Sequence, residues 1–427
     1  MGMEEDPKKE RPKEAPEDSG GDFSFLQEII KKEPVSKDKI LKKFIQIAVT
    51  GLIFGIFACT GFYALRPWAA RNFQAKADKV TIPEDEEEQT EEAVEETQPA
   101  EPVLSSDTYS ELLSYVYEIA REAEKCIVSV SAVNGEDLLS SDISVMKNEV
   151  SGIIVADNSR ELLIAANNIV CENAESWKVC FADNRSYPAT LKKQDRTIGL
   201  AVFAVERGGL ESSTWESLKI ATLGNSNLVT RGSTAIALGN MFGYSGGIGY
   251  GIISSTRYDM ELADGRYGVL GTDIAAADQG TGVLFNMKGE VTGLVMPNIW
   301  SGTEGTLANA YAISDLKTII EKLSNGESVP YLGIHGVTVD EATTKERGIP
   351  KGLYVLQVDA DSPAMGAGIQ NGDVLTQIGK TKITSMLVYQ KALQEFRTGE
   401  NIRVRGQRRG AGEYVDIEYT VTVGSRE

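Results

Sequence analysis

The chain has 427 residues, a formal net charge of −19 and a pI of about 4.7. This length predicts two or three domains, and the acidity excludes nucleic-acid binding, which requires a basic surface. The 42 glycines and many short apolar runs favour strands and turns over helical bundles. The single histidine, His335, restricts the acid–base chemistry open to the protein.

The four cysteines indicate neither a metal site nor a disulfide framework. They have no CxxC spacing and no accompanying histidine cluster, so we expect no metal and no cofactor. Cys59 lies in an apolar run, which leaves Cys126, Cys171 and Cys180. A Cys171–Cys180 bridge is one alternative outside the cell, but buried free thiols are the favoured interpretation.

The N-terminal region predicts a cytoplasmic tail and one membrane-spanning helix. Residues 1–43 are charged, contain prolines and have few large apolar side chains, a composition typical of disorder. Residues 44–65 contain no charged side chain, and this length suits a transmembrane helix better than a secretory signal. Six lysines in 31–43 precede the helix and four basic residues in 66–79 follow it, which places the N-terminus in the cytoplasm and the folded domains outside.

Residues 66–107 are predicted to form an acidic linker. Ten acidic residues and no basic residue lie between Glu84 and Glu101. Their mutual repulsion should keep the segment extended and solvated. We interpret it as a spacer between the membrane and the folded domains.

Residues 108–325 predict a domain rich in β-strands. Ser106 or Asp107 can cap an initial helix, and a closing helix is expected over 316–323. The short strand-like segments between these helices favour an all-β barrel or sandwich. They are 126–133, 151–156, 162–166, 177–181, 200–205, 234–238, 251–255, 267–271, 283–286 and 290–296. A last unit, 326–427, combines strands with a helix near 386–397.

Three glycine-containing stretches of the first folded unit are distinctive: SGIIVADNSRELLIAANNIV at 151–170, ALGNMFGYSGGIGYGIIS at 237–254 and TDIAAADQGTGVLFNMKGEVTGLV at 272–295. The last unit adds YLGI at 331–334 and SPAMGAGIQNGDVLTQIGKTKI at 362–383. The first three stretches resemble the protease domain, and the last two the PDZ domain, of the HtrA (DegP-like) family of trypsin-like serine proteases. The resemblance implies a mainly β fold, with a trypsin-like double β-barrel followed by a PDZ domain. The membrane helix would precede both.

The catalytic positions implied by the resemblance carry unsuitable residues. A serine protease needs a nucleophile, a general base, a carboxylate that orients the base, and backbone donors for the oxyanion. The base position falls on Asn168, the carboxylate position on Gly199 and the nucleophile position on Gly280. Asparagine cannot accept a proton near neutral pH and glycine has no side chain, so we expect the catalytic triad to be lost.

A one-residue slip in the alignment leaves one alternative nucleophile. It places Thr281 at the nucleophile position, where a lysine such as Lys192 would have to act as its base. A threonine hydroxyl without a base is a poor nucleophile. Val283 also replaces the family's proline after this loop, which argues against an intact oxyanion hole.

The PDZ-like unit retains its expected binding loop. The resemblance places the loop that captures a peptide's C-terminal carboxylate at Tyr331, Leu332, Gly333 and Ile334. Glycine lets the backbone turn so that several N–H groups converge on one carboxylate. The adjacent His335 either tunes binding with pH or is a polar strand residue. Expected partners are peptide or protein C-termini or unfolded segments.

These observations favour a membrane-anchored HtrA-like pseudoprotease that acts as a peptide-binding or regulatory module in the cell envelope. The alternative is an active serine-type endopeptidase of that family in envelope protein quality control. A third hypothesis is a holdase-like chaperone, for which the resemblance permits a homotrimer.

Overall fold

The computed structural model describes residues 42, 45–53, 55–57, 78–85, 106–133, 149–297, 299 and 307–427. Residues 42, 45–53 and 55–57 are helical, while the rest of the predicted membrane span 44–65 lies outside the described residues. The predicted tail 1–43 also lies outside them, except for residue 42. Within the described ranges, no helix is both long and apolar enough to cross a bilayer.

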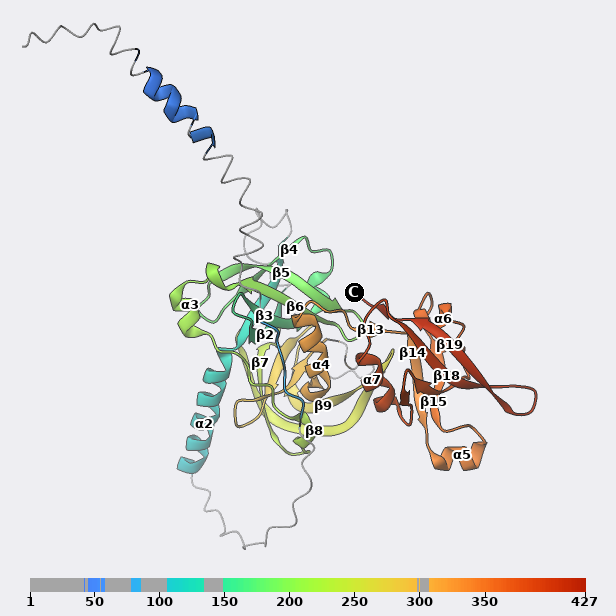
Figure 1. Ribbon diagram of the computed structural model, residues 1–427. Helices are drawn as coiled ribbons and strands as arrows, with labels where there is room; N and C mark the ends of the chain where they lie inside the picture. The colour runs from blue at the N-terminus through green and yellow to red at the C-terminus, as the bar shows by residue number, and fades with distance from the viewer. Residues whose placement is uncertain are drawn as a thin grey trace, which may run out of the picture. The chain divides into compact units, whose positions relative to one another are not determined.

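Two closed antiparallel barrels form the first folded region (Figure 1). The strands of the first barrel follow the order β1-β2-β3-β6-β5-β4, and those of the second follow β10-β11-β12-β9-β8-β7. Read backwards, the second order repeats the first, so the two barrels share one connectivity. The first barrel comprises β1 (Ile127–Val133), β2 (Glu149–Asp157), β3 (Glu161–Asn167), β4 (Ser176–Cys180), β5 (Ser186–Asp195) and β6 (Leu200–Glu206). The second comprises β7 (Thr234–Asn240), β8 (Gly247–Leu262), β9 (Gly265–Ala275), β10 (Thr281–Phe285), β11 (Val291–Val295) and β12 (Leu307–Ala312).

Apolar side chains fill each barrel and the space between the barrels. β3 and β6 are buried along almost their whole length because both are runs of Leu, Ile, Val, Ala and Phe. Their register pairs Ile164 with Phe203 in the first barrel. A separate core lies between the barrels and includes Ile153, Leu238 and Phe285. The predicted mainly β, barrel-type architecture is therefore confirmed.

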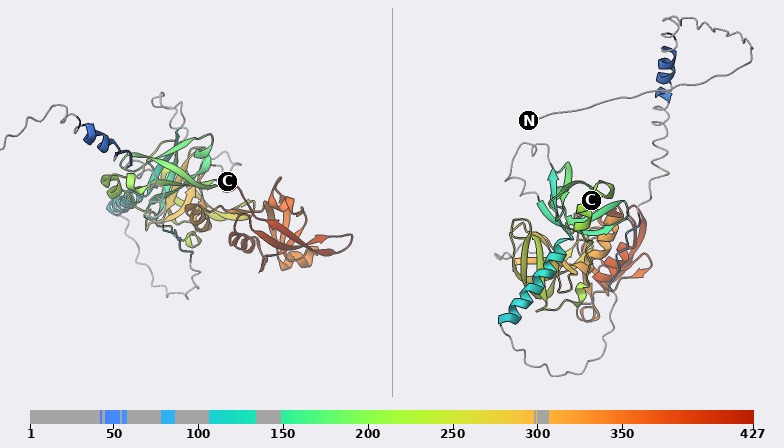
Figure 2. Two further views of the ribbon diagram at one scale, coloured as in Figure 1. Left: turned by 45° about the horizontal axis from the view of Figure 1, so that its top comes forward. Right: turned by 90° about the vertical axis from the view of Figure 1, so that its left-hand side faces the viewer.

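Helices cover the outside of this core. α2 (Ser106–Glu124) contacts β7, and Figure 2 shows it projecting along the outside of the barrels. α4 (Ile313–Ser324) contains the predicted closing helix and inserts Leu316, Ile319 and Leu323 between the barrels at helical spacing. The remaining short elements of this region are η2 (Asn168–Cys171), η3 (Arg207–Gly209), α3 (Ser212–Ser217) and η4 (Ser226–Leu228).

Two strands, β5 and β12, were not predicted. β5 contains Pro188 and several charged residues and is mostly half-buried, so it lacks the apolar alternation of a typical strand. β12 has the sequence LANAYA, whose small side chains have low β-propensity. Both strands form because barrel closure supplies hydrogen-bonding neighbours on each side.

The three described cysteines are free thiols, as the favoured interpretation predicts, but only Cys126 is buried, whereas Cys171 and Cys180 are partly exposed. Burial raises the pKa of Cys126 to about 12 and that of Cys171 to about 11. Both thiols therefore stay protonated and unreactive at neutral pH.

The C-terminal region forms a PDZ-type sheet. Its strands follow the order β14-β15-β16-β18-β19, with β17 paired to β16 and a separate β13–β20 pair. β14 is an edge strand and contacts α7 (Met386–Gln394), which ends three residues before the predicted 397. The other elements are β13 (Pro330–Tyr331), β14 (Ile334–Val339), α5 (Glu341–Arg347), β15 (Gly352–Val358), α6 (Pro363–Gly366), β16 (Val374–Ile378), β17 (Thr381–Lys382), β18 (Asn401–Arg409), β19 (Tyr414–Thr422) and β20 (Gly424–Ser425).

One part of the predicted solvated linker lies against the barrels instead. Residues 78–85, the docked segment, run beside α4 (Figure 1), and Val80 and Ile82 are each only 8% exposed. The Val80 N–H donates to Asn325 Oδ1 at 2.9 Å, and Lys317 pairs with Asp85 at 2.6 Å. The apolar alternation at 80 and 82 overrides the acidic composition, because it buries side chains in the core between the barrels.

We expect Val80→Asp to release the docked segment, because a carboxylate cannot be buried unpaired in an apolar core. Trypsin should then cleave after Lys79 about tenfold faster or more. Each loss of ~1.4 kcal/mol in the free energy of docking raises the fraction of molecules with a released segment tenfold. Thr81→Asp is the matched control, because it makes the same change at the exposed neighbouring position. Equal cleavage of both variants would contradict docking through Val80.

Candidate functional site

The structure brings the predicted base and carboxylate positions together. β3 ends at Asn167, whose side chain accepts the Ile169 N–H and starts η2 at Asn168. The Asn168 N–H donates to the Gly199 carbonyl at 2.9 Å. A Cβ added to Gly199 would lie 3.6 Å from Asn168 Oδ1. A side chain at either position would therefore meet the other, as the resemblance predicts for a base and its orienting carboxylate.

The groups at these two positions have no acid–base function. The Asn168 amide donates to Gln194 Oε1 at 3.4 Å. Gly199 ends the β5–β6 turn at φ +79°, a conformation that favours glycine. The nearby Asp195 carboxylate accepts the Thr197 N–H at 2.7 Å and so holds this turn. Burial raises the pKa of Asp195 to about 6, against the opposing hydrogen bonds from Thr197.

Gly280, at the predicted nucleophile position, has no room for a side chain. A Cβ there would lie 2.4 Å from the Met241 carbonyl oxygen, so even alanine would force the backbone to move. The Gly280 N–H donates to the Ala277 carbonyl at 2.9 Å. In trypsin-like enzymes the N–H of the nucleophile residue is one of the oxyanion donors. Here this N–H binds an internal carbonyl.

Thr281, the alternative nucleophile, joins the two barrels. Its hydroxyl oxygen accepts the Ser151 N–H at 2.8 Å, and its side chain is buried. The Ser151 hydroxyl donates to the Thr281 carbonyl at 3.1 Å and accepts the Asn240 N–H at 2.6 Å. Lys192, the suggested base, instead pairs with Glu161 at 2.8 Å. The Thr281 hydroxyl therefore contacts a backbone donor, with Lys192 engaged elsewhere.

The predicted carboxylate-binding loop has the expected backbone geometry. Gly333 has φ +86°, and the N–H groups of Leu332, Gly333 and Ile334 converge on one carboxylate. That carboxylate is the side chain of Asp264, in the turn between β8 and β9 of the second barrel. A Cβ on Gly333 would lie 2.4 Å from Ser362 Cβ, so the loop requires glycine.

Tyr331 and His335 flank this loop and share one acidic partner. The Tyr331 hydroxyl donates to Asp359 Oδ2 at 2.7 Å, and His335 Nε2 lies 2.9 Å from Asp359 Oδ1. Burial acts to raise the pKa of Asp359, but the bonds from Tyr331 and His335 and the charge of Arg426 hold it below its ordinary value. The side chains of Tyr331 and His335 are thus tied to the PDZ framework.

The sequence did not identify Asp264 or Tyr389 as part of this site. The Tyr389 hydroxyl donates to Asp264 Oδ1 at 2.6 Å. The Ala-Asp-Gly sequence at 263–265 is a turn signal, and the two-residue turn between Leu262 and Gly265 bears it out. No sequence pattern links that turn to a loop about 70 residues later. Among the described residues, no group of His, Cys, Asp and Glu could hold a metal ion.

Comparisons with known proteins agree with this geometry. Residues 150–294 match the trypsin-like peptidase domain and residues 354–408 match the PDZ domain. The Lactococcus lactis serine protease Do-like HtrA is 26% identical over 322 residues, covering 70% of this chain and 77% of the relative. The protein HhoA of Synechocystis is 31% identical over 280 residues, covering 61% of this chain and 68% of the relative. The chain belongs to the HtrA family.

A solved HtrA structure has the same fold. The HtrA-type protease AlgW, determined with a decapeptide, is 23% identical, with a TM-score of 0.52. It covers 73% of this chain, and 99% of the AlgW chain is matched. This HtrA family member therefore has the double barrel and the PDZ domain of its relatives.

We expect Thr281→Val to lower the free energy of unfolding of this HtrA homologue by about 1–3 kcal/mol, because the buried Ser151 N–H loses its acceptor. Thr281→Ser keeps the hydroxyl, so its free energy of unfolding should fall by about 1 kcal/mol or less, because only a methyl group is lost. Urea unfolding followed by tryptophan fluorescence measures both values. A valine variant as stable as the serine variant would contradict the barrel-joining role.

Proposed function

We propose that this HtrA homologue is a membrane-anchored pseudoprotease that binds the C-termini of peptides or proteins through its PDZ domain in the cell envelope. The observation that carries the proposal is the combination of residues at the three catalytic positions. Asn168 cannot take a proton near neutral pH, Gly199 cannot orient a base, and Gly280 has no nucleophile. Because Gly280 lies so close to the Met241 backbone, a side chain cannot be accommodated at this position without a backbone shift.

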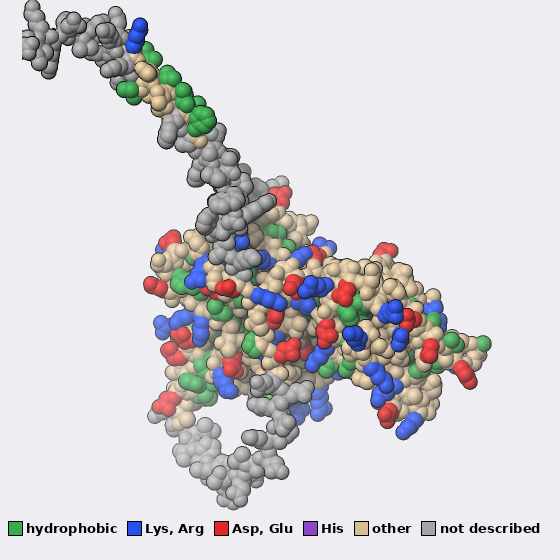
Figure 3. Space-filling view, in the orientation of Figure 1, with side chains coloured by type: hydrophobic (Ala, Val, Ile, Leu, Met, Phe, Trp, Pro, Cys, Tyr) green, Lys and Arg blue, Asp and Glu red, His purple; other side chains and the backbone are tan. Residues whose placement is uncertain are grey.

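The geometry of the PDZ domain supports peptide capture. The loop at 331–334 has three converging N–H groups, and β14 is an edge strand beside α7 to which an extended peptide can add. Figure 3 shows acidic and basic side chains interspersed on the visible face of the folded part. A mixed surface of this kind offers little long-range steering, so recognition would depend on short-range contacts in the groove.

The proposed location in the envelope rests on sequence features. The uncharged run 44–65 has the length of a membrane span, and the basic residues before it favour a cytoplasmic N-terminus. The folded domains would then lie outside the cytoplasm.

The second candidate function is an active serine-type endopeptidase, which the names of the relatives favour. We expect the full-length protein not to degrade unfolded casein above the buffer control, while trypsin does so in parallel. Gel electrophoresis over several hours measures the intact casein. Cleavage that disappears in Thr281→Ala would establish the second candidate and contradict the pseudoprotease.

Peptide capture is tested with a pool of fluorescein-labelled hexapeptides that end in an apolar residue. We expect the full-length protein to bind the pool with free C-terminal carboxylates and not its amidated counterpart, as measured by fluorescence anisotropy. Gly333→Ala should weaken binding about tenfold or more, because its Cβ would clash with Ser362 and displace the loop.

Gly399→Ala is the matched control for this experiment. Gly399 has the same φ of +86° in the same domain, but a Cβ there would meet no atom within 4 Å. It therefore introduces the same backbone strain without a clash at the loop. Equal binding by the two alanine variants would exclude the loop as the peptide site.

A further inference from the structure

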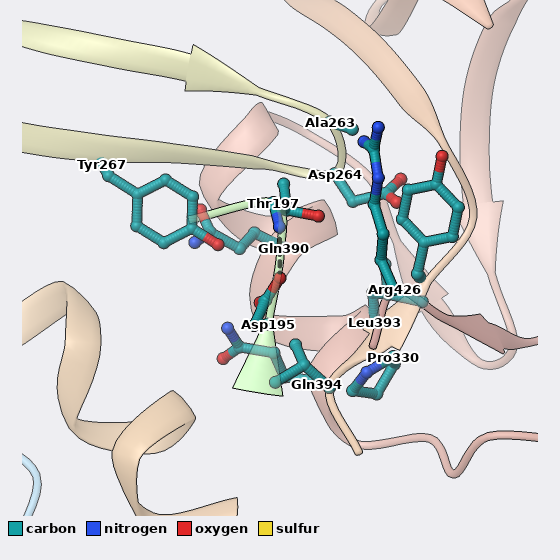
Figure 4. Close-up of a pocket in the computed structure, with 12 residues that line it drawn as sticks. Asp195, Thr197, Ala263, Asp264, Tyr267, Pro330, Gln390, Leu393, Gln394 and Arg426 are labelled. Carbon is teal, nitrogen blue, oxygen red and sulfur yellow. Dashed lines mark hydrogen bonds between the residues drawn. The ribbon is translucent and has the colours of Figure 1, made fainter. Parts of the chain in front are cut away.

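The turn between β8 and β9 places a carboxylate in the PDZ loop. These strands run out from the second barrel and end in the two-residue turn Ala263-Asp264. Asp264 has φ +60°, a conformation that aspartate tolerates better than most residues. Figure 4 shows Asp264 at the tip of the two strands, with Arg426 beside it. An acidic side chain of the protease domain thus reaches the proposed ligand position of another domain.

The hydrogen bonds of Asp264 match those expected of a peptide's last residue. Its Oδ2 accepts the N–H groups of Leu332 and Gly333 at 2.7 and 2.6 Å, and its Oδ1 accepts the Ile334 N–H at 3.1 Å. Its own N–H donates to the Ile334 carbonyl at 2.8 Å. A peptide that adds to β14 would offer the same pair of groups, a carboxylate for the loop and an N–H for the first strand carbonyl.

Hydrogen bonds satisfy the buried carboxylate of Asp264. Asp264 is 7% exposed, and a buried carboxylate is strongly unfavourable unless hydrogen bonds replace its water. Tyr389 supplies a fourth donor to the carboxylate at 2.6 Å, in addition to the three loop N–H groups. Burial still raises the pKa of Asp264, with these hydrogen bonds opposing the shift. The loop and Tyr389 together form a binding site that Asp264 fills.

We propose that Asp264 is an internal ligand of the PDZ carboxylate-binding loop, and that a partner's C-terminal carboxylate binds there only by displacing it. The same three N–H groups cannot serve two carboxylates at once. Binding of a partner therefore separates the tip of the β8–β9 hairpin from the PDZ loop. Competition by Asp264 also raises the partner concentration that is needed to occupy the loop. The proposal rests on the peptide capture proposed above.

Asp264→Asn tests the competition, because asparagine accepts the same backbone conformation and size but removes the charge. With the full-length protein and the free-carboxylate hexapeptide pool, we expect Asp264→Asn to lower Kd about tenfold or more. Glu261→Gln is the matched control, since it neutralises an exposed acidic residue three positions earlier in the same hairpin. This control should leave Kd unchanged.

Hydrogen–deuterium exchange gives a second readout that needs no external ligand. In the absence of peptide, the amides of 332–334 should exchange about tenfold faster in Asp264→Asn than in the wild type or Glu261→Gln. Thermal unfolding followed by circular dichroism confirms that the variants are folded.

The outcomes separate this inference from the proposed function. Tighter peptide binding and faster exchange in Asp264→Asn support the internal ligand. If Asp264→Asn has the Kd and the exchange rates of the wild type, Asp264 is not an internal ligand. Peptide capture still stands in that case, provided that Gly333→Ala weakens binding. Faster exchange with no peptide bound by any variant supports the Asp264 contact but overturns both the displacement by peptides and the proposed capture.

Discussion

The hydrogen bonds between Ser151 and Thr281 join the two barrels. A closed barrel pairs all of its strands internally, so its contacts with a neighbour must use side chains and the few backbone groups that face outward. Ser151 on β2 and Thr281 on β10 exchange two such bonds, and the Asn240 N–H adds a third. The apolar core between the barrels then packs around this polar contact.

This contact lies next to Gly280, the residue that the resemblance assigns to the nucleophile position. Trypsin-like enzymes place the base on one barrel and the nucleophile on the other, so that barrel packing positions the reacting groups. Here the packing is preserved, with Asn168 and Gly199 adjacent on the first barrel. On the second barrel, the chain at Gly280 approaches Met241 too closely for any side chain, and its N–H binds Ala277.

In the PDZ loop, too, buried polar groups must find hydrogen-bonding partners. Three N–H groups that converge on one point require an acceptor, and a buried carboxylate requires donors. Asp264 and the loop meet both requirements at once. A peptide partner would have to supply equivalent bonds. The free energy of the domain contact therefore enters directly into the affinity for any ligand of this loop.

The sequence alone determined the β-rich architecture, because strand signals are local patterns of residue type. The three altered catalytic positions and the carboxylate-binding loop are predictions from local motifs of the same kind. The sequence failed where neighbours distant in the chain decide the outcome. β5 and β12 have weak strand patterns and form because barrel closure pairs them, and the docked segment is acidic yet buries Val80 and Ile82. The sequence makes Thr281 a candidate nucleophile, whereas in the structure its hydroxyl accepts the Ser151 N–H. Only the tertiary structure brought Asp264 to Gly333, since hydrogen bonds between residues far apart in the chain leave no periodicity in the sequence.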